Sequence, residues 1–307
     1  MLVSIVVPSR NQGRYLGEAL DSVLRQPHRP LEILVVDGAS TDGTIALLED
    51  YARRFPEVLW WSEPDDGPAD AVNKGLARVR GDIIGILSSD DVYTPGAIAE
   101  VVTFFERQPT CGFAYGDVQG VGDRGELLSR TRHPEFSWEA MFGIALCLPQ
   151  GSIFFRTEVA RAAGFWNPAY FGCDLDYWLR LMMRTQSAKV PRVLSQWRMH
   201  PDQRTQARNF TRILRDYRQM ISDSDELRLA PARLRRLARA SCDIMAMDFG
   251  AGESNWRRRG YLLRALLRHP TAWRYIPQSK RNTLLPGYAW LRGQLKRLFR
   301  RPARDAA

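Results

Sequence analysis

Four short apolar runs alternate with helical periodicity in the first hundred residues, and this alternation limits the fold more than any other feature. The runs lie at about 3–7, 31–36, 58–61 and 83–87, and the helical segments at about 15–24, 43–54, 69–79 and 95–106. Apolar runs of this length are typical of buried strands. Repeated strand–helix–strand units predict an α/β fold with a mostly parallel central sheet flanked by helices.

Polar residues follow these predicted strands at the point where each strand ends. They are Ser9, Asp37, Asp65 and the pair Asp90 and Asp91. Ligands of open α/β sheets bind beyond the carboxyl ends of the strands. The sequence therefore predicts that several carboxylates converge on one binding site.

Adjacent carboxylates after a buried strand are costly to bury unless a cation lies beside them. Asp90 and Asp91 stand in this position, and a hard divalent cation held by carboxylates and substrate phosphates is one solution. The alternative is that Asp91 caps the following helix and Asp90 is solvated. Asp37 could contact a base or a ribose hydroxyl, or only shape a turn. The sequence has neither a G-x-G-x-x-G nor a Walker A pattern.

Five segments occur in an order and at a spacing that resembles family 2 glycosyltransferases: SIVVPSRNQ, VVDGASTDGT, SEPDDGPADAVNKG, GDIIGILSSDD and GCDLDYWLRL. The resemblance covers about residues 2–205 and implies the GT-A fold, a Rossmann-like sheet flanked by helices. It divides this domain into a nucleotide-sugar half, about 1–116, and an acceptor half, about 117–205. Residues 206–307 are expected to form an arginine-rich helical extension.

The resemblance also implies where the donor binds. Pro8 and Ser9 are expected to line the nucleotide pocket, and Asp37 to contact the nucleobase or ribose. Asp65 and Asn73 lie in the segment that is expected to reach the base and the phosphates.

The family's aspartate–any–aspartate metal motif aligns with Ser89-Asp90-Asp91, so its first member here is a serine. Asp91 is then expected to be the direct ligand of Mn²⁺ or Mg²⁺, and Asp90 to meet the ribose or a metal-bound water. The serine leaves the number of protein ligands open. His200 is expected to be a third metal ligand or a phosphate contact, the alternative being a surface histidine in a turn.

The family's catalytic base is an acid at the start of a helix beside the acceptor, and Asp174 aligns with it. Cys173 replaces the frequent glutamate of the family. Asp176 lies about 200° further around the same helix, so both acids cannot face one hydroxyl. Asp174 is favoured as the base, and helix capping is its alternative role.

The implied reaction is an inverting transfer of a sugar from a nucleotide-diphosphate sugar, with UDP-sugar as the default, to an acceptor hydroxyl. The acceptor is expected to be a saccharide or a lipid-linked saccharide, in cell-surface polysaccharide or lipopolysaccharide biosynthesis. Such an enzyme is a hexosyltransferase-type glycosyltransferase of the EC 2.4 class. The alternatives are a metal-dependent nucleotidyltransferase, which would release pyrophosphate, and a basic nucleic-acid- or membrane-binding protein.

The formal net charge of +10 belongs to the end of the chain. Residues 1–200 carry 20 Lys or Arg and 25 Asp or Glu, whereas residues 253–307 carry 14 and 2. Arginines interleave with apolar and aromatic residues through 257–301, which is typical of helices at a membrane surface. An anionic membrane is the expected partner, and packing on the catalytic domain is the alternative. No nucleic acid is expected, because no nucleic-acid motif accompanies the charge.

Four scattered cysteines, none in a C-x-x-C pair, favour a reducing compartment over a disulfide framework or a zinc site. The apolar run at 3–7 is too short for a signal peptide and has no basic residues before it. No apolar stretch approaches the roughly 18 residues that span a bilayer. The expected location is cytoplasmic, with a peripheral place on the inner face of the cell membrane.

Overall fold

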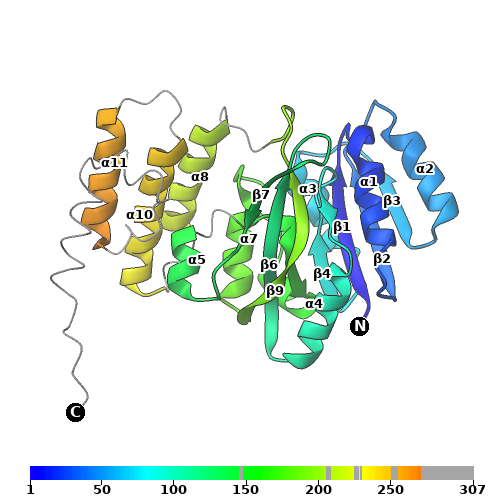
Figure 1. The fold of residues 1–307 in the computed structure, drawn as a ribbon, viewed down its shortest axis with the longest axis horizontal. Helices are drawn as coiled ribbons and strands as arrows, with labels where there is room; N and C mark the ends of the chain where they lie inside the picture. Colours follow the sequence, from blue (N-terminus) through cyan, green and yellow to red (C-terminus); the bar gives the residue numbers. More distant parts are fainter. Residues whose placement is uncertain (145–147, 205–208, 225–227, 229, 250–254, 271–307) are drawn as a thin grey trace, which may run out of the picture. The chain divides into compact units, whose positions relative to one another are not determined.

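The computed structural model describes residues 1–307 except 145–147, 205–208, 225–227, 229, 250–254 and 271–307. The four strands predicted in the first hundred residues are present as β1 (Val3–Ser9), β2 (Leu31–Asp37), β3 (Val58–Ser62) and β4 (Ile83–Ile86). They pair in parallel in the order β3-β2-β1-β4 (Figure 1). Their carboxyl ends therefore meet at one edge of the sheet.

The same sheet continues beyond β4 in the order β8-β6-β9-β5, with β7 paired to β6. These strands are β5 (Val92–Tyr93), β6 (Cys111–Val121), β7 (Leu127–Thr131), β8 (Ile153–Arg156) and β9 (Gln186–Arg198). β8 is antiparallel to both of its neighbours, whereas β9 runs parallel to β6. Most paired residues are in parallel ladders, so the predicted α/β fold is confirmed, with antiparallel strands added.

Helices cover both faces of the sheet. Those of the sheet-containing part are α1 (Gly13–Leu24), α2 (Thr44–Arg54), α3 (Pro68–Leu76), α4 (Ala97–Arg107), α5 (Trp138–Ile144), α6 (Thr157–Ala163), α7 (Cys173–Met182) and α8 (Phe210–Asp223), with a 3₁₀ turn η2 (Gln150–Ser152). α1 and α4 share one core cluster with Ile5. α3 lies on the opposite face, where a Cβ added at Gly75 would come within 2.4 Å of Val6. Alternate residues of β1 thus pack under different helices.

Three predicted bounds differ from the structure. The helix predicted over 69–79 ends at Leu76. The helix predicted from Pro95 begins at Ala97, because Gly96 before it adopts a left-handed φ of 79°. The apolar and aromatic residues from Phe113 to Tyr115 also predict a short strand, and the structure has the long strand β6 there, whose polar and glycine residues interrupt its apolar positions.

The chain's contacts divide it into two compact units, Met1–Leu229 and Ala230–Ala307. In the second unit, α10 (Ala232–Phe249) and α11 (Asn255–Arg268) are paired, and buried Asp243 forms ion pairs with Arg264 and Arg268 of α11. The predicted extension over 206–307 is helical where it is described, and most of the basic segment 257–301 lies outside the described residues. No helix in the described ranges is both long and apolar enough to cross a membrane.

Candidate active site

The carboxyl ends of β1 and β2 bring together the residues predicted to bind the nucleotide. Pro8 pairs with Val36 in the sheet, and the N–H of Gly38 donates to the carbonyl of Ser9 at 2.8 Å. A Cβ added at Gly38 would lie 2.3 Å from Oδ2 of Asp65, so this carboxylate rests directly on the glycine. Only a residue without a side chain allows that approach.

The hydroxyl of Ser9 is buried and has no hydrogen-bond partner within the described residues. A buried hydroxyl without a partner costs free energy unless a ligand or water satisfies it. Ser9 stands at the strand end where the nucleotide was predicted. This orphaned hydroxyl is therefore a candidate contact for a bound ligand.

Asp37 is fully buried and already accepts three hydrogen bonds. Its donors are the N–H of Ser40 at 2.9 Å, the hydroxyl of Ser40 at 2.5 Å and the hydroxyl of Ser62 at 2.7 Å. The carboxylate thus fixes the turn after β2 to the end of β3. A direct contact with a base or ribose remains a prediction, and it would have to use a lone pair left over from these bonds or displace a serine.

Asn73 of α3 binds the segment that precedes α7. Its amide donates to the carbonyl of Trp166 at 2.9 Å and accepts from the N–H of Trp166 at 2.8 Å. This reciprocal pair joins residues 93 positions apart and links the predicted nucleotide half to the acceptor half. A phosphate contact from Asn73 remains a prediction, for which the second amide hydrogen is the remaining donor.

Asp91 follows β4 and is buried, with its Oδ1 accepting the backbone N–H of Arg198 at 2.9 Å. Burial, together with the neighbouring charge of Asp90, raises the pKa of Asp91 well above its ordinary value. The helix α4 has no side-chain cap, so Asp91 does not serve as its cap. Two carboxyl groups that oppose each other's ionisation therefore lie at this strand end.

His200 lies inside this site and not on the surface, which makes the surface alternative wrong. It is 5% exposed, its ring centroid lies 4.8 Å from that of Tyr15, and its Nε2 lies 3.0 Å from Oδ2 of Asp90. The parallel pairing of β9 with β6 carries the residues just after β9 to the carboxyl end of β4. Asp90, Asp91 and His200 thus form one group from distant parts of the chain.

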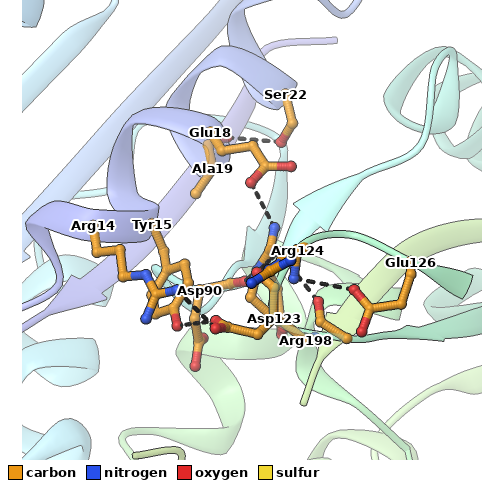
Figure 2. Close-up of polar contacts among 12 residues, drawn as sticks. Arg14, Tyr15, Glu18, Ala19, Ser22, Asp90, Asp123, Arg124, Glu126 and Arg198 are labelled. Atoms are coloured by element: carbon orange, nitrogen blue, oxygen red, sulfur yellow. Dashed lines mark hydrogen bonds and ion pairs between the residues drawn. The ribbon is translucent and has the colours of Figure 1, made fainter. Parts of the chain in front are cut away.

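Arg198 was not predicted as a site residue, yet it contacts both Asp90 and Asp91. It is 3% exposed, and its guanidinium binds the carbonyl of Asp90 and the carboxylate of Glu18 (Figure 2). It stands two positions before His200, but periodicity alone could not reveal it. The same strand also carries Lys189 and Arg192, so charge within the strand does not single out Arg198.

The donor set fits a hard divalent cation. Asp91 and Asp90 are the carboxylates that could bind such an ion, and His200 lies beside Asp90. Across the described ranges no three His, Cys, Asp or Glu side chains are grouped so as to hold a metal. Mg²⁺ and similar ions are commonly held by one or two carboxylates together with substrate phosphates, so this small set suffices.

The two candidate bases differ in what they already bind. Asp176 is buried and forms an ion pair with Arg180 at 2.8 Å, and Arg180 also binds the carbonyl of Phe165. Asp174 is half-buried in the first turn of α7, which has no side-chain cap. Burial raises the pKa of Asp174, and the charge of Arg204 opposes that rise. Asp176 is thus held by an ion pair, and the role of Asp174 as base stays a prediction.

A short segment connects the two groups of acids. His200 contacts Asp90, while Arg204 influences Asp174 and donates to the carbonyl of Phe171 at 2.8 Å. Four residues span at most about 14 Å even when fully extended. The segment from His200 to Arg204 therefore runs from the Asp90 group to Phe171, three residues before Asp174.

Comparison with known proteins gives one family for most of this region. The sequence profile described as glycosyl transferase family 2 matches residues 4–165. Chondroitin synthase of Escherichia coli is 29% identical over 185 residues, which are 59% of this chain and 26% of that protein. The chain thus spans about a quarter of that relative's length, and 52% and 15% of the next two curated relatives.

Two solved structures share the fold. TarS of S. aureus in complex with UDP-GlcNAc has a TM-score of 0.63 at 16% identity, covering 93% of each chain. The mannosyltransferase PcManGT of Pyrobaculum calidifontis in complex with GDP-Man and Mn²⁺ has a TM-score of 0.59 at 19% identity, covering 97% of this chain and 81% of that one. At this identity the likeness supports the GT-A fold of the chain.

Proposed function

The chain belongs to glycosyl transferase family 2, and we propose that it transfers a sugar from a nucleotide-diphosphate sugar to an acceptor hydroxyl with inversion at the anomeric carbon. One observation carries the proposal. Asp90, Asp91 and His200 meet at the carboxyl end of β4, where Asp91 is buried beside Asp90. UDP is the default nucleotide, and a saccharide or lipid-linked saccharide of the cell surface is the proposed acceptor.

Asp174 is proposed to act as general base. In its ionised form it accepts the proton of the acceptor hydroxyl as that oxygen attacks the anomeric carbon from the side opposite the nucleotide. The bond from the anomeric carbon to the diphosphate oxygen breaks, and the nucleoside diphosphate leaves. Ser9 and Asp65 are proposed to hold the nucleoside, which places the sugar in line with the attacking oxygen.

Asp91 is proposed to hold Mn²⁺ or Mg²⁺, with Asp90 and His200 beside it. When bound, such an ion neutralises the negative charge that develops on the leaving diphosphate. The protein's part is to keep Asp91 buried and oriented through the N–H of Arg198. PcManGT, which binds GDP-Man with Mn²⁺, supports this assignment by its fold.

A thermal-shift panel tests the proposal. UDP, dTDP, GDP, NAD and ATP are each added with Mn²⁺ or with EDTA to the wild type, to Asp91→Asn and to the matched control Glu32→Gln. A ligand at about 100 times its Kd stabilises the folded state by roughly 2.7 kcal/mol. We expect one nucleoside diphosphate to stabilise the wild type and Glu32→Gln only with Mn²⁺, and Asp91→Asn not at all. No response to any diphosphate would overturn the proposed nucleotide site.

An activity assay separates the transferase from its main alternative. A glycosyltransferase releases the nucleoside diphosphate from the donor, whereas a nucleotidyltransferase releases pyrophosphate. We expect nucleoside diphosphate release that needs Asp174. Pyrophosphate release would replace the proposal with the alternative.

We also propose a peripheral place on the cytoplasmic leaflet, through the exposed face of α11. Trp256, Leu263 and Leu267 are 81%, 60% and 75% exposed, and their spacing of seven and four residues puts them on one face. α11 also carries five arginines and no acid. Apolar side chains flanked by arginines suit an anionic bilayer surface.

Vesicle flotation tests this location with the full chain. We expect binding to phosphatidylglycerol vesicles but not to phosphatidylcholine vesicles, and loss of binding when Trp256, Leu263 and Leu267 are all changed to Ser. The matched control changes Leu127 and Leu128 to Ser, since these leucines are also exposed but lie on β7. Equal flotation of both variants would contradict the membrane contact.

A further inference from the structure

Arg198, the last residue of β9, is buried between elements that come from four parts of the chain. Its Nε donates to the carbonyl of Asp90 at 3.0 Å, and its Nη2 donates to Oε2 of Glu18 on α1 at 2.6 Å. Its Nη1 donates to the carbonyl of Asp123 at 3.1 Å and, more weakly, to that of Gly122 at 3.4 Å. Figure 2 shows these partners around one guanidinium.

The backbone of Arg198 makes the contact that matters most for the site. Its N–H donates to Oδ1 of Asp91 at 2.9 Å. One residue therefore contacts both members of the acidic pair: its main-chain N–H binds the carboxylate of Asp91, and its side chain binds the backbone carbonyl of Asp90. Movement of Arg198 would move the Asp91 carboxylate and the backbone that carries the Asp90 carboxylate.

Tyr15 and the turn between β6 and β7 hold Arg198 from the other side. The guanidinium carbon lies 5.3 Å from the centroid of the Tyr15 ring, and the same ring packs on His200. The hydroxyl of Tyr15 donates to Oδ1 of Asp123 at 2.5 Å, and Arg14 forms an ion pair with Asp123 at 2.7 Å. Tyr15 is thus a common platform for Arg198 and His200.

From this geometry we infer that Arg198 is a positioning residue: it sets the placement of Asp90 and Asp91, and through them the binding of the divalent cation and the donor diphosphate. The inference rests on the proposed function of this site. Arg198 does not touch the donor itself, since its guanidinium is engaged with Asp90, Glu18 and the β6–β7 turn.

The chemistry of the side chain explains why an arginine is needed. The contacts use the Nε hydrogen, both hydrogens of Nη1 and one of Nη2, which point in different directions from one plane. A lysine has a single ammonium and cannot reach Asp90, Glu18 and the turn together. Lysine at this position preserves the positive charge but cannot make the hydrogen bonds to Asp90, Glu18 and the turn at the same time.

The test measures Mn²⁺ binding by the electron paramagnetic resonance of free Mn²⁺, with UDP, GDP or dTDP present at saturation. Changing a residue that orients metal ligands commonly weakens metal binding by about 10- to 100-fold. We expect Arg198→Lys to raise the Kd for Mn²⁺ by about that factor, and to raise the KM for the donor more than it lowers kcat. A residue that only supports the fold would leave the Mn²⁺ Kd of the folded protein unchanged.

Arg156 offers a matched control. Its guanidinium also binds carbonyls inside the protein, those of Cys111 and Phe105, both at 2.9 Å, and it packs on the Phe105 ring. None of these contacts involves the acidic pair. Arg156→Lys is expected to lower the unfolding midpoint while the Mn²⁺ Kd stays at the wild-type value.

Glu18→Gln keeps the inference falsifiable if Arg198→Lys does not fold. The Glu18 side chain is 58% exposed on α1, so its replacement is tolerated by the fold, yet it removes the charge that anchors Nη2. We expect weaker Mn²⁺ binding with an unchanged unfolding midpoint. Wild-type Mn²⁺ affinity in both Arg198→Lys and Glu18→Gln, or an equal loss in Arg156→Lys, would overturn the inference. Failure of the wild type to bind Mn²⁺ with any diphosphate would instead overturn the proposed function.

Discussion

Glu32 and Asp91 are buried carboxylates at opposite ends of the same parallel strands, and they are 3% and 4% exposed. Glu32 accepts hydrogen bonds from the hydroxyl of Ser4 at 2.5 Å, from the N–H of Arg80 at 2.8 Å and from its guanidinium at 2.7 Å. Burial favours the neutral form of Glu32, but these donors prevail and hold its pKa below the ordinary value. For Asp91, burial and the charge of Asp90 prevail over the contacts from Arg198 and Ser88, so its pKa is raised.

The two carboxylates are equally buried, but they differ in the hydrogen-bond donors that surround them. Glu32 has enough donors to be ionised at no net cost, and it ties β1, β2 and the loop before β4 together. Asp91 has fewer donors and an acidic neighbour, so its ionised form is disfavoured unless a cation lies beside it. Equal burial is thus compatible with a structural role for Glu32 and with the proposed metal-binding role of Asp91.

The largest expected effect concerns Asp174, which resembles Asp91 in having a raised pKa through burial. We expect Asp174→Asn to lower turnover by about 10²- to 10⁴-fold, the usual contribution of a general base. The free energy of unfolding at pH 7 should rise, because the amide carries no charge into a partly buried position. Release of the nucleoside diphosphate and urea unfolding measure the two quantities.

Asp176→Asn is the control for that variant. It removes the ion pair with Arg180, so it should lower the free energy of unfolding and retain far more turnover than Asp174→Asn. A greater loss of turnover in Asp176→Asn than in Asp174→Asn would identify Asp176 as the base. The raised pKa that Asp174 shares with Asp91 would then not mark a catalytic acid.

A smaller effect is expected for Glu32, at the amino ends of the parallel strands. Glu32→Gln should lower the free energy of unfolding by about 1–3 kcal/mol, since hydrogen bonds to a charged group are lost or weakened. Its turnover per folded molecule should equal that of the wild type. Glu49→Gln, at an exposed position of α2, is the control and should change stability by less than about 0.5 kcal/mol. A loss of turnover in Glu32→Gln without a loss of stability would contradict the structural role.

The strand ends of the first hundred residues could be predicted because local patterns determine them. Apolar runs set β1 to β4, and parallel pairing then brings Ser9 and Asp65 to one edge. The resemblance to the family added the metal and base assignments, which remain predictions. Asp42 also acts locally, because its Oδ1 accepts the N–H of Thr44 at 3.0 Å at the start of α2.

The remaining features of the site depend on contacts that no local pattern records. Arg198 and Asp91 are 107 residues apart, and they meet only because β9 inserts between β6 and β5. Asn73 and Trp166 meet across 93 residues for a similar reason. Hydrophobic periodicity predicts that a strand exists, but it does not predict which strands become neighbours. The functional boundary expected near residue 205 stays a prediction, while the contacts place α8 in the first unit.

The smallest expected effect is the pH dependence of the free energy of unfolding, which should have opposite signs for Glu32 and Asp174. Glu32 has a folded pKa below its ordinary 4.5, so its stabilising contribution is present above the unfolded-state pKa and is lost as pH falls through the folded pKa. Asp174 has a folded pKa above its ordinary 3.8, so its ionisation costs stability increasingly as pH rises from that value through the folded pKa. At pH 7, Glu32→Gln should therefore be less stable than the wild type and Asp174→Asn more stable.

Both differences should shrink as pH is lowered, the one for Asp174→Asn as pH falls through a raised pKa and the one for Glu32→Gln as pH falls below 4.5 through a lowered pKa, because protonated carboxyl groups resemble the amides that replace them. Urea unfolding of the three proteins at several pH values between 7 and 3 measures the convergence. A difference for Glu32→Gln that stays constant with pH would mean that the variant lost packing or a neutral hydrogen bond, and not a charge held by Ser4 and Arg80. A difference in the free energy of unfolding for Asp174→Asn that stays constant with pH would mean that the surroundings of Asp174 do not oppose its ionisation. Asp174 would then differ from Asp91 in this respect.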